Sequence, residues 1–143
     1  MINLGEDELL LDSEELNDRV LRQASIETQP NPNPGLDYLC HLEGNLGEAS
    51  TTRVSLRYVP GKLVLDTEAL GLYLCSVEPQ ERQSLEALAA LLLDDLNNEL
   101  VPRWIQVILY ADDHSLDRGH RVLLEDRQPK WDNPTLLARI SGF

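Results

Sequence analysis

The sequence has few cysteines and few basic residues. Its two cysteines, Cys40 and Cys75, exclude a disulfide framework and a four-cysteine zinc site. Lysine and arginine total 12 against 25 aspartates and glutamates, which gives a net charge of -13 at pH 7. Because this charge repels phosphate backbones and anionic lipid surfaces, we expect neither nucleic acid nor a membrane as a partner.

Long apolar runs and a basic amino terminus are also absent. No run approaches the roughly 20 residues of a membrane span, and the segment Met1 to Asp12 is acidic where a signal peptide is basic. These absences predict a cytoplasmic location. With 143 residues, 42% of them hydrophobic and 26% charged, the chain has the composition of one folded domain.

Residues 1–35 are expected to form an acidic leading helix and a proline-rich connector. Leu16, Val20 and Leu21 recur at helical spacing after Ser13, which can serve as an N-cap, and this pattern predicts a helix over residues 13–24. The connector follows at residues 29–35, which read Q-P-N-P-N-P-G. Prolines there remove backbone donors and asparagines favour turns, so we expect no helix or strand.

Residues 36–126 are expected to form one α+β domain that starts with an antiparallel hairpin. The first strand is predicted at the apolar-rich segment from Leu36 to Leu42. The second is predicted at residues 53–59, where Val54, Leu56 and Tyr58 alternate with polar residues, and residues 44–47 have the composition of the turn between them. A brief extended segment is predicted at residues 63–65.

Two helices and a second hairpin are predicted next. Apolar residues at helical spacing indicate helices over residues 70–77 and 85–96, with Pro79 suited to the first turn of the second helix. The β-rich runs at 104–110 and 120–124 lie on either side of a polar loop, Ala111 to Gly119. The expected order is therefore hairpin, helices, hairpin.

The remaining residues, 127–143, are expected to be a carboxyl-terminal tail that wraps a surface or contacts a neighbouring subunit. No metal site is predicted. The polar loop gathers carboxylates and imidazoles, but their spacing matches no known ligand pattern, so they are interpreted as a solvated turn: Asp112, Asp113, His114, Asp117 and His120.

Several segments resemble the nitrile reductase (QueF) family of the tunnelling-fold superfamily. Residues 58–60 (Y-V-P) and 66–76 (D-T-E-A-L-G-L-Y-L-C-S) are similar, in frame, to the family's Y-x-P and E-S-K-S-L-K-L-Y-L-x-S-F. Residues 94–96 (D-D-L) and 101–107 (V-P-R-W-I-Q-V) are similar to its N-D-L helix end and D-P-R-Y-I-E-V. The resemblance covers about residues 36 to 110 and implies a tunnelling fold, in which two antiparallel hairpins form a sheet with two helices packed on one face.

The resemblance also implies a chemistry, because the family reduces the nitrile of 7-cyano-7-deazaguanine with NADPH on the route to the tRNA base queuosine. This reaction needs a cysteine thiolate, a proton-shuttling acid, basic residues for the NADPH phosphates and a glutamate for the base. The base-holding glutamate corresponds to Glu86. One carboxylate can accept hydrogen bonds from both adjacent N–H groups of a guanine-like edge. The competing interpretation is that Glu86 is an ordinary solvated acid at the start of a helix.

Two parts of the reductase machinery depart from the family pattern. The two lysines of E-S-K-S-L-K fall on Glu68 and Gly71, so NADPH is expected as a cofactor only if the chain is an enzyme. The family's C-P loop is missing, and Cys40, followed by His41, lies within a predicted strand. Residues 39–42 (L-C-H-L) instead resemble L-S-W-L in the non-catalytic amino-terminal half of the two-domain form of the family.

The sequence therefore predicts a pseudoenzyme that acts as a ligand-binding or assembly subunit. Its ligand would be purine-like or pterin-like and held by Glu86. Since tunnelling-fold sheets have edges that need partners, we expect a homo-oligomer or an assembly with another subunit. Two alternatives stay open: a divergent enzyme of 7-deazaguanine metabolism, nitrile reductase-like or amidinotransferase-like, acting through Cys40; and a purely structural interaction protein.

Overall fold

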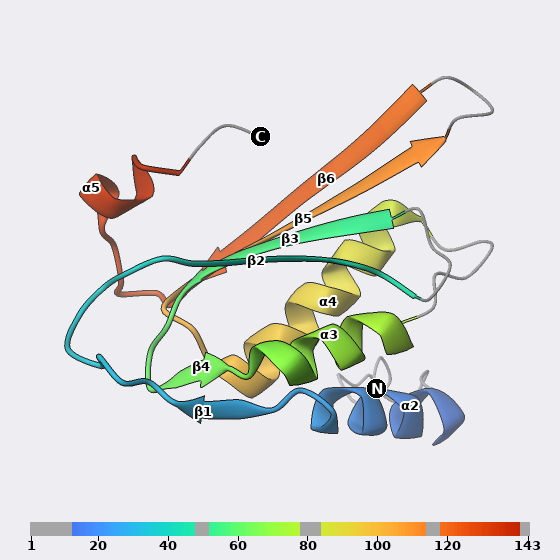
Figure 1. The fold of residues 1–143 in the computed structure, drawn as a ribbon, viewed down its shortest axis with the longest axis horizontal. Coiled ribbons are helices and arrows are strands. Elements are labelled where there is room, and N and C mark those ends of the chain that lie inside the picture. The colour runs from blue at the N-terminus through green and yellow to red at the C-terminus, as the bar shows by residue number, and fades with distance from the viewer. Residues whose placement is uncertain (1–12, 48–51, 78–83, 114–117, 141–143) are drawn as a thin grey trace, which may run out of the picture.

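The computed structural model describes residues 13–47, 52–77, 84–113 and 118–140 (Figure 1). Its elements follow the order helix, strands, two helices, hairpin and a short last helix. They are α2 (Ser13–Ala24), β1 (Thr28–Pro30), β2 (Cys40–Asn45), β3 (Thr52–Val59), β4 (Leu63–Leu65), α3 (Thr67–Ser76), α4 (Leu85–Leu100), β5 (Trp104–Asp113), β6 (Arg118–Arg127) and α5 (Pro134–Leu137). None of the helices among these residues is long and apolar enough to cross a bilayer.

The centre of the fold is an antiparallel sheet with strand order β2-β3-β5-β6. The side chains of alternate β3 residues, Val54, Leu56 and Tyr58, point into the core, because successive side chains of a strand face opposite sides of the sheet. Helix α3 packs against β2, and α4 packs against β5 and β6. The predicted architecture of two hairpins with two helices on one face is confirmed.

The core lies between the sheet and the two helices. Helix α4 contributes apolar residues at helical spacing, as its sequence predicted, and Gly44 of β2 allows α3 to approach the sheet closely. A Cβ atom at Gly44 would lie 2.9 Å from Leu74 Cδ1, so a larger residue would force the Leu74 side chain to shift. The largest fully buried side chains are Trp104, Tyr58, Tyr73, Leu46, Leu56, Leu92, Leu96, Leu100, Ile105, Leu109, Val59 and Val107.

The first strand lies later in the chain than expected. The sequence placed it at Leu36 to Leu42, but β2 spans Cys40–Asn45, and the predicted turn residues Gly44 and Asn45 pair with Val54 and Arg53. The preceding segment is held by side chains instead of a strand ladder. Arg103 donates hydrogen bonds to the carbonyls of Pro34 and Leu36 at 2.7 and 3.0 Å.

The proline-rich connector also differs from the expectation that it contains no strand. Strand β1 pairs with β4 in a two-stranded ribbon, where Pro30 lies opposite Leu63 at the end of β1. A proline is tolerated there because the last residue of an edge strand does not have to donate to a ladder. The connector continues as a loop anchored by Asn31, which donates to the Gly61 carbonyl at 2.8 Å.

The second hairpin is longer than predicted. Strand β5 extends to Asp113 and β6 begins at Arg118, so much of the expected polar loop belongs to the ladder. The remaining loop residues, 114–117, lie outside the described part of the chain, as does Pro79. Among the described residues no group of carboxylates, imidazoles and thiols has the arrangement of a metal site.

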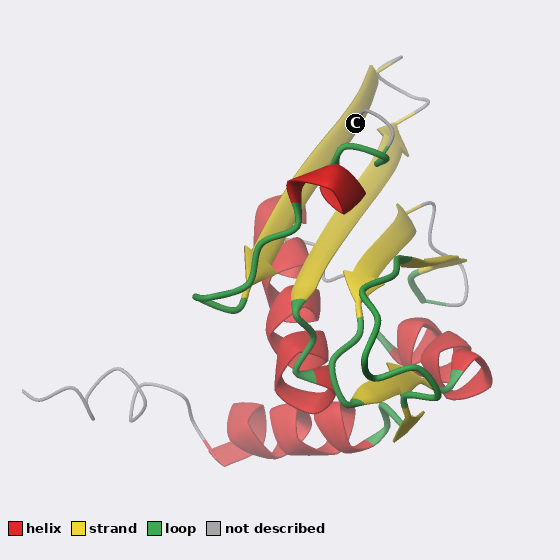
Figure 2. Cartoon of the chain, turned by 90° about the vertical axis from the view of Figure 1, so that its left-hand side faces the viewer, coloured by secondary structure: helices red, strands yellow, loops and turns green. Residues whose placement is uncertain are grey.

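The tail after β6 folds back on the segment before β2. Asp37 accepts hydrogen bonds from the Trp131 indole and the Asn133 amide, both at 3.1 Å, and forms an ion pair with Arg103. In the view of Figure 2, α5 lies in front of the sheet and α4 lies behind it. The tail therefore contacts its own subunit.

The leading helix α2 has the bounds that the sequence predicted, and it is attached through buried polar contacts. The Asp95 carboxylate of α4 is fully buried. It accepts hydrogen bonds from Arg22 Nε at 2.5 Å, Gln23 Nε2 at 3.0 Å and the Tyr73 hydroxyl at 2.6 Å. Burial raises the pKa of Tyr73, and the neighbouring carboxylate raises it further, so the phenol stays protonated and donates.

Replacing Asp95 by alanine should strongly destabilise the protein. The substitution leaves the Tyr73 hydroxyl and the Gln23 amide buried without their acceptor, and we expect a loss of about 3 kcal/mol in the free energy of unfolding. Asp94→Ala is the matched control, because its ion pair with Arg19 is exposed and such pairs contribute less than about 1 kcal/mol. Urea denaturation measures both, and equal losses would contradict the assigned role of Asp95.

Candidate functional site

Cys40 lies at the start of β2, opposite Tyr58 of β3. The thiol is half-buried against the core and hydrogen-bonded to the Tyr58 hydroxyl, which also accepts the Leu65 amide at 3.0 Å. Burial raises the pKa of Cys40, and the hydrogen bond from Tyr58 only partly offsets this effect. Because the thiolate is the nucleophilic form, the site holds Cys40 in its unreactive form at neutral pH.

Glu86 lies in the first turn of α4, after the N-cap Ser84. Its side chain is 65% exposed and lies beside β6, with Oε1 3.6 Å from His120 Nε2. It therefore flanks the edge of the sheet. Glu86 does not line the groove or the cavities described below.

Cys40 and Glu86 are not brought together within one chain. They lie at opposite edges of the sheet, since Cys40 is on β2 and Glu86 contacts β6. In the strand register Cys40 lies opposite Tyr58, Tyr58 lies opposite Ile105, and Ile105 lies opposite Asp126. Asp126 is six residues away from His120 along β6. Strand spacing and rise per residue then separate the two sites by about 14 Å across the sheet and about 20 Å along it.

A groove of about 530 Å³ lies between β2 and α3, beside the segment whose sequence resembles the family's NADPH-binding motif. Gly71 lies in this groove with open space around it, since a Cβ atom there would meet nothing within 4 Å. Glu43 and Cys75 are the titratable residues of its described lining, which contains no lysine or arginine. A phosphate would find no cation there to pair with.

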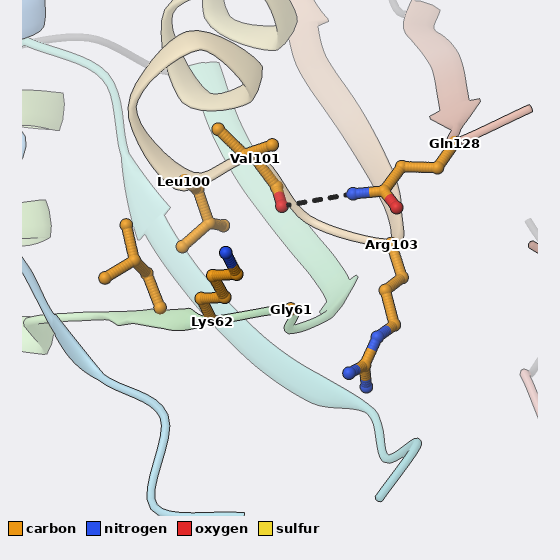
Figure 3. Close-up of a pocket in the computed structure, with 7 residues that line it drawn as sticks. Gly61, Lys62, Leu100, Val101, Arg103 and Gln128 are labelled. Atoms are coloured by element: carbon orange, nitrogen blue, oxygen red, sulfur yellow. Dashed lines mark hydrogen bonds between the residues drawn. The ribbon is translucent and has the colours of Figure 1, made fainter. Parts of the chain in front are cut away.

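A second cavity, of about 490 Å³, was not predicted from the sequence (Figure 3). It lies between the Gly61 turn and the end of α4, where Val101 adopts the left-handed conformation with φ 46°. The wall is apolar at Leu63, Leu100 and Val101, and Lys62 extends toward it, whereas Arg103 points away. Among the described residues the lining has no carboxylate, thiol or imidazole, so Lys62 is its candidate for a nucleophile or general acid.

Comparison with known proteins gives a consistent result at the level of family and fold. Models of protein families give no match to the chain. It is 33% identical over 91 residues to an NADPH-dependent 7-cyano-7-deazaguanine reductase of Anaeromyxobacter sp. (strain K), a match that covers 58% of this chain and 74% of the relative. The reductase of Thermomicrobium roseum is 30% identical over 121 residues, with 79% and 92% covered.

Longer matches and a solved structure agree with these relatives. The reductase of the same name from Acidithiobacillus ferrooxidans is 28% identical over 128 residues, which are 80% of this chain and 86% of the relative. The crystal structure of the apo form of an archaeosine synthase QueF-Like superposes with a TM-score of 0.50 at 20% identity, covering 62% of this chain and 91% of that one. The fold is therefore the tunnelling fold.

Proposed function

Because the chain belongs to the 7-cyano-7-deazaguanine reductase (QueF) family, we propose that it is a member without reductase activity that works as an assembly subunit. The observation that carries this proposal is the environment of Cys40. Cys40 lies in a strand, where its thiol is half-buried and hydrogen-bonded to Tyr58. Burial raises the pKa of this thiol. A thiol that adds to a nitrile needs the opposite conditions, namely access and a lowered pKa.

The second support is the electrostatics of the groove beside α3. Glu68 and Gly71 occupy the positions where the resemblance implies lysines; Gly71 lines the groove without a side chain, and Glu43 contributes its negative charge. A negative groove in a chain of net charge -13 disfavours the phosphates of NADPH. The loss of the cofactor cations and the loss of an activated thiol are independent, and both point away from reduction.

We expect no oxidation of NADPH in the presence of 7-cyano-7-deazaguanine. Absorbance at 340 nm follows the cofactor, with an active reductase of the family as the positive control. Cys40→Ser should give the same background rate as the unmodified protein, because Cys40 does no chemistry. A rate that depends on the nitrile and falls in Cys40→Ser would contradict the proposal and support the alternative of a divergent enzyme acting through Cys40.

Assembly is supported by the two edges of the sheet. Within the described residues β2 pairs only with β3, and β6 pairs only with β5, so the outer backbone groups of both strands lack a ladder partner. An edge of this kind is satisfied when a second sheet continues it. An antiparallel sheet extended from subunit to subunit would form a homo-oligomer, or a mixed assembly with a related chain.

Light scattering at micromolar concentration should give a mass that is a multiple of 16.1 kDa. Because each subunit carries a net charge of -13, raising the salt concentration from 20 to about 200 mM should favour the assembled form by screening repulsion. A stable species of 16.1 kDa at every salt concentration would contradict self-association and leave only a mixed assembly.

The same assembly gives a role to Glu86, which lies on the outer side of α4 beside the edge strand β6. A neighbouring subunit at that edge would cover the exposed carboxylate and create a pocket between subunits. We assign the expected purine-like or pterin-like ligand to this pocket. The carboxylate would accept the two adjacent hydrogens of a guanine-like edge, and His120 would hold it in position.

Glu86→Gln should weaken the binding of such a ligand about thirtyfold, on the order of 2 kcal/mol. The reason is that an amide NH₂ donor replaces one of the two carboxylate oxygens that accept hydrogen bonds. Calorimetry with 7-cyano-7-deazaguanine, guanine and a pterin measures the change. Glu68→Gln removes a comparable exposed helix acid and should leave the affinity unchanged. Binding that is equal in wild type and Glu86→Gln would overturn the role of Glu86 without affecting the assembly proposal.

A further inference from the structure

Three arginines line one hollow on the face of the sheet that lies away from α3 and α4. The hollow has a volume of about 280 Å³, and its lining includes Arg53 and Arg57 of β3 and Arg121 of β6. Ser55 and Tyr110 also line it. Side chains two residues apart on a strand point to the same face, so Arg53, Ser55 and Arg57 all project from the side opposite the core residues Val54 and Leu56.

The strand register fixes how these groups are arranged. Arg53 lies opposite Tyr110, and Tyr110 lies opposite Arg121, so the three residues form one row across β3, β5 and β6. The Arg121 guanidinium lies 4.9 Å from the centre of the Tyr110 ring, which restrains it by a cation–π contact. The two arginines of this row are therefore about 10 Å apart at their Cα atoms, on either side of the tyrosine.

The charge in the hollow opposes that of the whole protein. The chain has 25 acidic residues against 12 basic ones, yet the described residues that line the hollow include three arginines and one carboxylate, Glu43. Glu43 lies 4.0 Å from Arg53, at the limit of an ion pair, and Arg53 is 61% exposed. The described lining of the hollow therefore presents three guanidinium groups, of which Arg57 also donates a hydrogen bond to Gln106, and one carboxylate.

We propose that this hollow is a binding site for the phosphate groups of a small phosphorylated molecule. Arginine suits this ligand because its planar fork of donors matches two phosphate oxygens, and the Ser55 hydroxyl adds a further donor. The volume of about 280 Å³ suits a small ligand. A nucleic acid would extend beyond the hollow onto a protein of net charge -13, where its phosphates would be repelled.

Apart from Glu43, the residues that line the hollow are not used in the proposed function. Cys40 packs against the core, and Glu86 meets His120 on the helix-covered side, whereas the hollow belongs to the other face. Among its lining residues, Glu43 also lines the groove beside α3. The inference therefore holds or fails independently of reductase activity and of the ligand of Glu86.

Inorganic pyrophosphate is the probe, measured by calorimetry and by ³¹P NMR at low ionic strength. Arg53→Gln and Arg121→Gln should each weaken binding about tenfold, because each removes one charge-assisted contact. Glu43→Gln should strengthen binding, since it removes the carboxylate that lies beside Arg53. Arg19→Gln is the matched control: it removes an equal charge from α2, where Arg19 pairs with Asp94, and should leave binding unchanged.

Three results would overturn the assignment, provided that circular dichroism finds the variants folded. Pyrophosphate that does not bind the wild type rules out the site. An equal loss of affinity in Arg19→Gln would mean that only the overall charge matters. Competition by oligonucleotides whose affinity rises with length would mean that the surface binds nucleic acid, contrary to the proposal. Opposite effects of Arg53→Gln and Glu43→Gln are the result that supports it.

Discussion

The structure depends on one constraint: the four-stranded sheet is covered by the main helices on a single face. Alternate apolar residues of β3 and β5 face α3 and α4 and form the core, whereas the second face carries the arginines of β3 together with Val59, Trp104 and Ile108. The sheet also has two exposed edges, which are formed by β2 and β6. Edges and faces that one subunit leaves open are the places where partners and ligands bind, so the fold itself determines where function can lie.

The buried Asp95 explains why the leading helix stays attached despite its exposed apolar residues. Leu16, Val20 and Leu21 of α2 are between 50% and 70% exposed, so apolar burial does not hold this helix in place. Its attachment comes from Arg22 and Gln23, whose hydrogen bonds converge on one carboxylate. Fully buried carboxylates are rare unless paired, and this one is satisfied by three separate side chains.

The sequence predicted the elements whose signal is local. Helix α4 could be recognised because six apolar residues repeat at helical spacing, and α2 because Leu16, Val20 and Leu21 follow the same spacing. The start of β2 could not be predicted, because Leu36 looks like a strand residue, and the Arg103 hydrogen bonds that hold its segment outside the sheet come from 67 residues away. Contacts of that range leave no local pattern.

For the candidate sites, too, the sequence predicted individual residues but not which of them lie close together in the fold. The family resemblance identified Cys40 and Glu86 one residue at a time, but no motif states that they lie at opposite sheet edges. The arginines of β3 were visible as polar residues alternating with apolar ones, a pattern that fits any solvated strand face. Only the register with Tyr110 and Arg121 distinguishes a charged hollow from a set of separate surface arginines.

The separation of Cys40 and Glu86 has a consequence for any chemistry that this fold performs. A reaction that needs both a thiol near β2 and a carboxylate near β6 must take them from two subunits joined at their edges. Assembly is then a requirement for catalysis in such a fold, whereas catalysis is not a requirement for assembly. A chain of this family can therefore lose its nucleophile and its cofactor lysines while the constraint that keeps its edges paired remains in force.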